Sequence, residues 1–432
     1  MSLRQNAMWL ILLTGILAIV GIWTATPELR NVWALPAALL LSGLAYEAAM
    51  LSRCPVGLEL QAPEYWPLGR AQEVRYVFQQ HARRELAIQV VLSAPEEFAA
   101  QSRIETLQLI DGRPDTVALT AAPRRMGRHS WPTPTLRIGG ALRLAWWSRR
   151  VSTECKLTVV PDVVGTTDQS RAEQGAGARP LRAAGAGAEV LQLREYRRGD
   201  PLRAIDWKAT ARRGRLVSRD VSEDQHLEVM VAVDAGRASG LGADDVDRLS
   251  LYVNVAARFA ERAAALDDAV GLVIYAAQPL AVLAPARGEA AVGRIRDLLT
   301  ACRVQQSESN PVVAAARIHA IAQRRSLILF LTDLEDASAG EQLAKAVRIL
   351  TPKHLPFIAG FQSTRIEALA RAAAQEPLGA YRALAAVEYV NTVAGNVRAL
   401  RALGAAALTA RAADLDRAVI EAYRQFREQR RI

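Results

Sequence analysis

Cysteine is scarce in this sequence: only three occur in 432 residues, far apart and without a Cys-x-x-Cys pair. An odd, scattered set of thiols argues against a disulfide framework and suits a reducing compartment. The five histidines show no metal-ligand spacing. The chain also lacks a Gly-x-x-x-x-Gly-Lys-Ser/Thr phosphate loop, a Gly-x-Ser-x-Gly nucleophile elbow and a His-Glu-x-x-His zinc motif. We therefore expect a protein that is not an enzyme; a hydrolase assembled from distant residues is the least favoured alternative.

Apolar residues are plentiful by contrast, at 51% of the chain, which is rich for a soluble protein. Two apolar runs, Ala7–Thr26 and Val32–Leu51, are each long enough to cross roughly 30 Å of hydrocarbon as a helix. The single charge of the second run, Glu47, lies near its end, where it can reach the headgroup region. Tryptophans suited to anchor at the membrane interface lie near the run ends: Trp9, Trp23 and Trp33. Residues 1–53 are therefore predicted to form a transmembrane helical hairpin.

A cleaved signal peptide is the alternative for the first run, because Thr24–Thr26 is rich in small residues. The second run follows after five residues, which favours the hairpin. Arg4 and Arg53 flank its two ends, so the positive-inside rule predicts that both ends face the cytoplasm. Most of the chain is then cytoplasmic and tethered to the membrane.

Residues 54–161 show the apolar–polar alternation of short strands, as in Glu73–Phe78 and Lys156–Val160. About seven such strands predict an all-β, sandwich-like module, which we interpret as a spacer or docking module. Residues 162–190 are rich in glycine and alanine, and this composition predicts a flexible linker.

From residue 226 to residue 432 the pattern changes to strands alternating with helices. Four near-continuous apolar runs are typical of strands buried on both faces: Leu227–Val233, Ala269–Tyr275, Ser326–Thr332 and Leu355–Phe361. The chain is therefore predicted to be multidomain, ending in a doubly wound α/β domain with a mostly parallel sheet.

Between the linker and this domain, residues 191–225 form a basic strap. Arg194–Arg219 holds nine Lys/Arg and three Asp/Glu, so its local charge is +6 of a total of +10. We expect the strap to wrap the α/β domain with Trp207 buried as an anchor and Asp206 bonded to nearby backbone or arginine. A direct ligand-binding role is the alternative.

The strap also carries a recognisable motif, made of Arg194, Glu195, Tyr196, Gly199, Asp200, Arg203, Asp206, Trp207 and Arg212. This run resembles the signature of the bacterial family of domain of unknown function 58 (DUF58). The resemblance implies a protein of the bacterial inner (cytoplasmic) membrane with a von Willebrand factor A-like (vWA-like) domain. It also implies a partner, a MoxR-type AAA+ ATPase acting on a client protein.

Three arginines remain for contact with a partner or the membrane surface: Arg212, Arg213 and Arg215. A membrane-anchored, protein-binding adaptor is therefore the function we expect. Basic residues interleaved with aromatics also suit a binder of nucleic acid or anionic lipid, which is the alternative.

Two acids are the candidate site of the α/β domain. Asp234 follows the first predicted strand and Asp333 follows the Ser326–Thr332 strand, so both should lie at the carboxyl edge of the sheet, where ligands collect. Hard oxygen ligands of this kind suit Mg²⁺. In vWA-like domains the resemblance places a metal-ion-dependent adhesion site here, of the form Asp-x-Ser-x-Ser with a distant Thr and Asp. In this chain Gly236 and Ala238 replace the two serines.

The distant threonine of that site has no clear counterpart, and Ser309 and Asn310 are the nearest candidates. We therefore expect no cofactor at this degenerate site, with Mg²⁺ as the alternative. The favoured interpretation is that the two aspartates cap helices or pair with arginines of the strap. Arg237 is the candidate for a guanidinium that replaces the ion.

Overall fold

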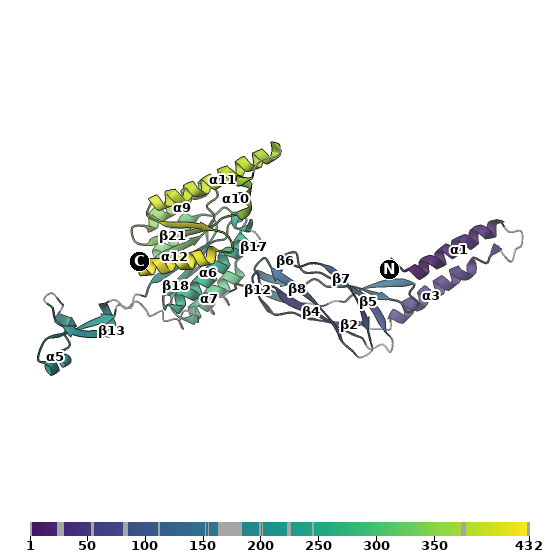
Figure 1. Cartoon of the computed structure of the whole chain (residues 1–432), viewed down its shortest axis with the longest axis horizontal. Helices are drawn as coiled ribbons and strands as arrows, with labels where there is room; N and C mark the ends of the chain where they lie inside the picture. Colours follow the sequence, from purple (N-terminus) through teal and green to yellow (C-terminus); the bar gives the residue numbers. More distant parts are fainter. Residues whose placement is uncertain are drawn as a thin grey trace. The chain divides into compact units, whose positions relative to one another are not determined.

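The computed structural model describes residues 2–23, 30–52, 56–80, 85–110, 113–151, 153, 155–162, 184–197, 200, 202–222, 226–243, 246–372 and 377–429. The chain divides into two compact units, Met1–Val160 and Pro161–Ile432. Each unit has its own sheets (Figure 1). The prediction of a multidomain chain is therefore confirmed.

Two apolar helices open the first unit, α1 (Gln5–Trp23) and α3 (Ala34–Ser52). Each has 19 residues and is long and apolar enough to cross a membrane. They pack against each other, while most of their large apolar side chains are exposed. The two predicted helices are thus confirmed, and their exposed surface is what a lipid-facing pair requires. The predicted boundary after residue 53 lies outside the described residues.

The other described residues of this unit form a β-rich module with three sheets. The first has the order β1 (Ser2–Leu3), β11 (Ala145–Arg150), β10 (Thr135–Gly139), β5 (Leu86–Leu92) and β7 (Arg103–Leu109). The second has the order β2 (Val56–Gln61), β4 (Gln72–Gln80), β8 (Asp115–Pro123) and β6 (Phe98–Ala99). The third joins β3 (Tyr65–Pro67), β12 (Lys156–Val160) and β9 (Gly127–Ser130). Pairing is antiparallel except between β3 and β12.

The strands of the module form because their apolar residues alternate and bury one face. In β4, Val74, Tyr76 and Phe78 are fully buried while their neighbours face outward. Trp66 stacks on Trp131 at 6.0 Å, and the Trp131 indole donates to the Tyr76 hydroxyl at 2.7 Å. The buried aromatic rings thus hold strands from two of the sheets together.

The basic strap is an antiparallel pair, β13 (Ala184–Glu195) and β14 (Val217–Ser222), joined through η1 (Leu202–Ala204) and α5 (Trp207–Arg213). β13 begins inside the predicted linker, because Ala184 and Gly185 pair with the end of β14. Asp162, the first residue of that linker, is also held: its amide donates to Asn254 Oδ1 at 2.7 Å, and Arg258 pairs with its carboxylate at 3.0 Å. Both ends of the predicted linker are therefore structured, and residues 163–183 lie outside the description.

The α/β domain has one six-stranded sheet. Its order is β19 (Pro279–Ala286), β18 (Ala269–Tyr275), β15 (Glu228–Asp234), β20 (Leu327–Leu331), β21 (Leu355–Phe361) and β22 (Ala406–Ala410). All neighbours are parallel except β18 and β19, so the predicted mostly parallel sheet is confirmed. After β15, the chain adds β18 and β19 on one side of that strand. The next strand, β20, then pairs with the other side of β15. Such a reversal of strand order creates a crevice at the carboxyl ends of the two central strands.

Two groups of helices cover the sheet (Figure 1). One group is α6 (Arg248–Ala265), α7 (Glu289–Ala301) and α12 (Leu415–Glu428). The other is α8 (Pro311–Ile321), α9 (Ala337–Leu350), α10 (Thr364–Arg371) and α11 (Pro377–Ala402). Short pieces after β15 lead into α6: η2 (Arg237–Gly240), β16 (Gly242–Ala243) and β17 (Val246–Asp247). Burial of both faces explains why the central strands are apolar without alternation.

Candidate functional site

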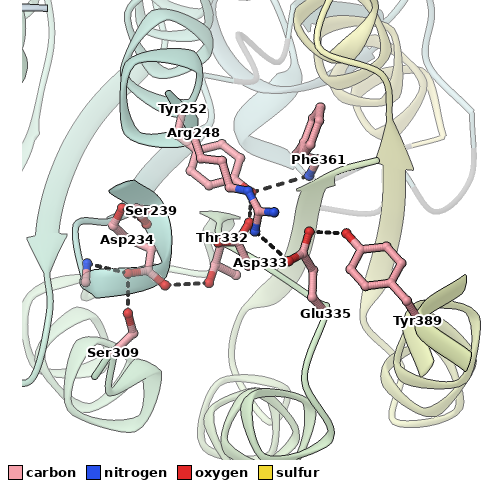
Figure 2. Close-up of polar contacts among 11 residues, drawn as sticks. Asp234, Ser239, Arg248, Tyr252, Ser309, Thr332, Asp333, Glu335, Phe361 and Tyr389 are labelled. Carbon is pink, nitrogen blue, oxygen red and sulfur yellow. Dashed lines mark hydrogen bonds and ion pairs between the residues drawn. The ribbon is translucent and has the colours of Figure 1, made fainter. Parts of the chain in front are cut away.

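The two predicted acids lie at the same edge of the sheet. Asp234 is the last residue of β15, and Asp333 follows β20, its parallel neighbour. The side chains of both residues are buried, and the two whole residues are 4% and 8% exposed. Figure 2 shows the two carboxylates above the strand ends with their partners around them.

Hydrogen bonds from the protein surround Asp234. Its Oδ1 accepts from the Gly236 amide at 2.9 Å and from the Ser309 hydroxyl, and its Oδ2 accepts from Thr332 Oγ1 at 2.7 Å. Ser239 donates to its backbone carbonyl at 2.9 Å. Burial raises the pKa of Asp234 above its ordinary value, although the bonds from Ser309 and Thr332 oppose that rise. Both carboxylate oxygens are thus already engaged by the chain itself.

Gly236 makes room for one of these donors. A Cβ at this position would lie 2.1 Å from Ser309 Oγ, so a side chain here would displace the serine. A hydroxyl group therefore reaches Asp234 from Ser309, in the loop before α8. Of the two residues considered for the distant threonine, Ser309 contacts Asp234, whereas Asn310 caps α8 through Val313 N at 3.3 Å.

Asp333 faces a buried guanidinium (Figure 2). Arg248 Nη1 lies 3.2 Å from Asp333 Oδ2 and 2.7 Å from Glu335 Oε2, and its side chain is 6% exposed. Tyr252 donates to Asp333 Oδ1 at 2.6 Å, and Tyr389 donates to Glu335. Arg248 therefore sits between two carboxylates as their shared cation.

The electrostatics follow from this burial. Burial raises the pKa of Asp333 to about 6, against the opposing effects of Arg248 and Tyr252. Burial alone would lower the pKa of Arg248, but Asp333 and Glu335 more than offset it and hold the pKa above its usual range. The guanidinium is thus a permanent charge at neutral pH.

These residues do not fit a Mg²⁺ ion. Mg²⁺ demands near-octahedral oxygen ligands, yet Gly236 and Ala238 offer no hydroxyl and the oxygens of Asp234 are taken. Arg248 supplies positive charge next to Asp333, the other acid. Within the described part of the chain, no group of three or more His, Cys, Asp or Glu residues could hold a metal ion.

Two expectations about the acids were wrong. The N-caps of the helices that follow are Gly236 and Asp336, not Asp234 and Asp333. Among the described residues, the partners of the two acids include no arginine of the strap. Arg237, the predicted replacement for the ion, instead pairs with Glu308 and is exposed. Arg248 is instead the guanidinium that lies beside Asp333, and sequence reasoning missed it because the two residues are far apart along the chain.

The strap motif holds itself together around Asp200. Arg194 donates two hydrogen bonds to this carboxylate, at 2.7 and 2.9 Å, and the Arg197 amide donates a third at 2.9 Å. The Arg194 bond, followed by the Arg197 amide, lowers the pKa of Asp200 to about 2. Tyr196 donates to the Asp200 carbonyl at 3.2 Å. The motif residues around Asp200 therefore form a turn, and the carboxylate of Asp200 within it is ionised at neutral pH.

Asp206 organises the second half of the strap. Its carboxylate accepts from the Ala209 amide at 2.9 Å as the N-cap of α5, and Arg219 lies 3.9 Å away. This matches the expected bonding to backbone and arginine. Trp207, however, is 66% exposed, so its predicted burial was wrong. Trp207 is the first residue of α5, a helix in which no residue is buried.

The remaining strap residues fall into three groups. Arg212 and Arg213 are exposed in the last turn of α5, and Arg215 pairs with Glu195. Of Arg203 only its place in η1 is described, and Gly199 lies outside the described residues. The strap thus presents a tryptophan and arginines on one short helix.

The fold and the site define a membrane-associated, multidomain protein whose parallel α/β domain carries two buried acids at its carboxyl edge. Residues 192–359, which span most of the strap and much of that domain, match the family model described as "Protein of unknown function DUF58". The chain therefore carries a DUF58 region, and the resemblance inferred from the strap motif is confirmed. A search of curated proteins gives no match.

Solved structures with partial similarity include two bacterial proteins. One is the conserved hypothetical protein BatB from Bacteroides thetaiotaomicron, with 16% identity over 31% of this chain and 66% of that one, at a TM-score of 0.26. The other is an aerotolerance-related membrane protein from Bacteroides fragilis NCTC 9343, with 11% identity over 45% and 97%, at a TM-score of 0.30. Structural similarity at these TM-scores says nothing about the function of this chain.

Proposed function

We propose that this protein is a membrane-anchored, non-enzymatic adaptor of the inner membrane whose vWA-like domain binds another protein without a divalent cation. The observation that carries the proposal is Arg248, whose buried guanidinium lies between Asp333 and Glu335. A cation-dependent adhesion site needs an ion with a vacant position for a partner's carboxylate. A guanidinium that is 6% exposed offers none. Recognition must then use exposed groups elsewhere in the DUF58 region.

The strap supplies such groups. Arg212 and Arg213 are exposed at the end of α5, and Trp207 on the same helix is 66% exposed. Arginine and tryptophan are the side chains most often found at the centre of protein interfaces. An acidic protein surface is the complement of this helix. The DUF58 resemblance suggests its source, a MoxR-type AAA+ ATPase that remodels a client held at the membrane.

Co-purification from native membranes tests this proposal. The tagged full chain should retain the ATPase in the presence of EDTA, whereas Arg212→Glu with Arg213→Glu should reduce retention at least tenfold. A matched control places the same charge change on α9, as Lys345→Glu with Arg348→Glu, where both side chains are exposed. Equal loss in both variants, or loss on EDTA treatment alone, would contradict a cation-independent contact through the strap.

One observation favours a second function, binding of a polyanion such as nucleic acid or anionic lipid. Trp207 is exposed next to Lys208, and an aromatic ring beside basic groups can stack a nucleobase, worth about 1–3 kcal/mol per base. Fluorescence anisotropy with single-stranded DNA distinguishes the two functions. Binding that weakens roughly tenfold or more in Trp207→Ala favours the nucleic acid; binding that depends only on salt does not.

A further inference from the structure

A turn of the β-rich module lies against the second apolar helix and encloses its only charge. Glu47 of α3 is fully buried. Its Oε1 accepts from the amides of Leu142 and Leu144 at 3.0 and 3.1 Å. Its Oε2 accepts from the Ala145 amide at 3.2 Å and from the Trp147 indole at 3.3 Å. Four N–H donors of the module thus satisfy a carboxylate that was expected to reach out toward headgroups.

Backbone groups of the turn between β10 and β11 are also hydrogen-bonded within the protein. The Gly140 amide donates to Ala145 O at 3.3 Å, and the Arg143 amide donates to Gly140 O at 3.0 Å. The Leu144 carbonyl accepts from the Arg4 amide at 2.8 Å, just before α1 begins. Segments at membrane depth require this, because hydrocarbon offers no hydrogen bonds to the backbone.

The position of the turn along α3 sets its depth. A Cβ on Gly43 would lie 2.6 Å from Leu144 Cδ1 and 3.4 Å from Leu142 Cδ1, so both leucines reach the level of Gly43. Gly43 precedes Ser52, the end of α3, by nine residues, which is roughly 13 Å of helix. The Leu144 carbonyl also accepts from Arg4, just before α1 begins, so the turn lies level with the start of α1, where a spanning hairpin would meet the phospholipid interface.

We propose that the turn Gly140–Leu144 is embedded in the phospholipid interface and that Glu47 holds it there. Leu142 is 47% exposed and enters the acyl boundary, while exposed Arg143 extends to lipid phosphates. Arg4 lies over the Trp146 ring at 4.4 Å, the type of aromatic and basic pair found at membrane interfaces. The inference rests on the part of the proposed function in which α1 and α3 cross the bilayer.

Site-directed spin labelling of the full chain in nanodiscs containing an anionic phospholipid tests the inference. With the native cysteines replaced by serine, single labels are placed at Leu142→Cys, Ile16→Cys in α1 and Tyr65→Cys in β3. Ile16 and Tyr65 are 50% and 62% exposed. β3 pairs with β12, at the end of the module away from α3 (Figure 1). Accessibility to oxygen reports lipid and accessibility to a nickel chelate reports water.

The label at Leu142 should resemble that at Ile16, with high oxygen and low nickel accessibility, whereas Tyr65 should be accessible to nickel. If Leu142 resembles Tyr65 while Ile16 stays in lipid, the inference is overturned and the spanning helices stand. If Ile16 is also accessible to nickel, the membrane part of the proposed function fails together with the inference.

Two variants test the role of Glu47. Glu47→Ala should raise the nickel accessibility of the Leu142 label severalfold, and Glu59→Ala, an exposed acid in β2, should not. Gly140→Ala should have the same effect, because its Cβ would lie 2.0 Å from the Glu47 carboxyl carbon. Gly57→Ala is its control, since the nearest atom is 3.7 Å away. Unchanged accessibility in both Glu47→Ala and Gly140→Ala overturns the inference.

Discussion

Replacing Arg248 by alanine should destabilise the α/β domain strongly. The guanidinium lies 3.2 Å from Asp333 Oδ2 and 2.7 Å from Glu335 Oε2, with 6% of its side chain exposed. Removing one partner of a buried ion pair costs about 3–5 kcal/mol, because the remaining charge is left without compensation. Each kcal/mol shifts the Tm of a domain of this size by about 2–4 °C, so the transition of this domain should fall by roughly 6–20 °C.

The same variant should acquire a response to divalent cations. With the guanidinium gone, Asp333 and Glu335 face the space it filled. A cation that binds only the folded domain, at ten times its Kd, stabilises it by about 1.4 kcal/mol. Millimolar Mg²⁺ or Mn²⁺ should therefore recover part of the lost Tm in Arg248→Ala, and the wild type should not respond.

Differential scanning fluorimetry of the detergent-solubilised full chain, with and without EDTA, measures both effects. Arg296→Ala is the matched control: its ion pair with Glu261 leaves 42% of the arginine side chain exposed, so its loss should cost no more than about 1 kcal/mol. A loss in Arg248→Ala as small as in this control would refute the structural role of the guanidinium. An equal response of the wild type to Mg²⁺ would refute the view that arginine replaces the ion.

Three further outcomes are expected. Asp206→Ala removes the N-cap of α5 and should cost about 1 kcal/mol, seen as faster amide hydrogen exchange in that helix. Gly236→Ser should destabilise the domain because its Cβ would lie 2.1 Å from Ser309 Oγ, and adding Ser309→Gly should restore part of the loss of Tm. Burial raises the pKa of Asp333 to about 6, so the folded domain keeps a proton that the unfolded chain releases near pH ~4. Domain stability should therefore fall as pH rises between those values, and Asp333→Asn should flatten that fall in urea titrations.

The sheet and its edge could be predicted from the sequence because they depend on local patterns. One apolar run ends in Asp234 and another precedes Asp333. These runs predicted two parallel strands with acids at one edge of the sheet, and the parallel pairing of β15 with β20 confirms this prediction. The motif around Asp200 was likewise readable, since its residues lie close together along the chain. Local spacing and strand burial therefore carried these predictions.

The charged partner of Asp333 could not be predicted from the sequence, because it comes from a helix that is distant along the chain. Arg248 is the first residue of α6 and looks like any arginine on an exposed helix end. Its burial becomes evident only when the strand order places that helix end between Asp333 and Glu335. The error at Trp207 has a different origin: aromatic side chains are usually buried, but this one belongs to a short helix in which no residue is buried.

Two features of this edge of the sheet balance its acids within the chain itself. The lack of a side chain at Gly236 leaves the space that Ser309 fills, so the protein engages Asp234. Arg248 supplies positive charge to Asp333. Without either feature, a buried carboxylate would lose a partner. Because the charge that balances Asp333 belongs to the chain and is buried, we infer that the stability of this edge of the sheet should change little with salt and should not depend on the supply of divalent metal.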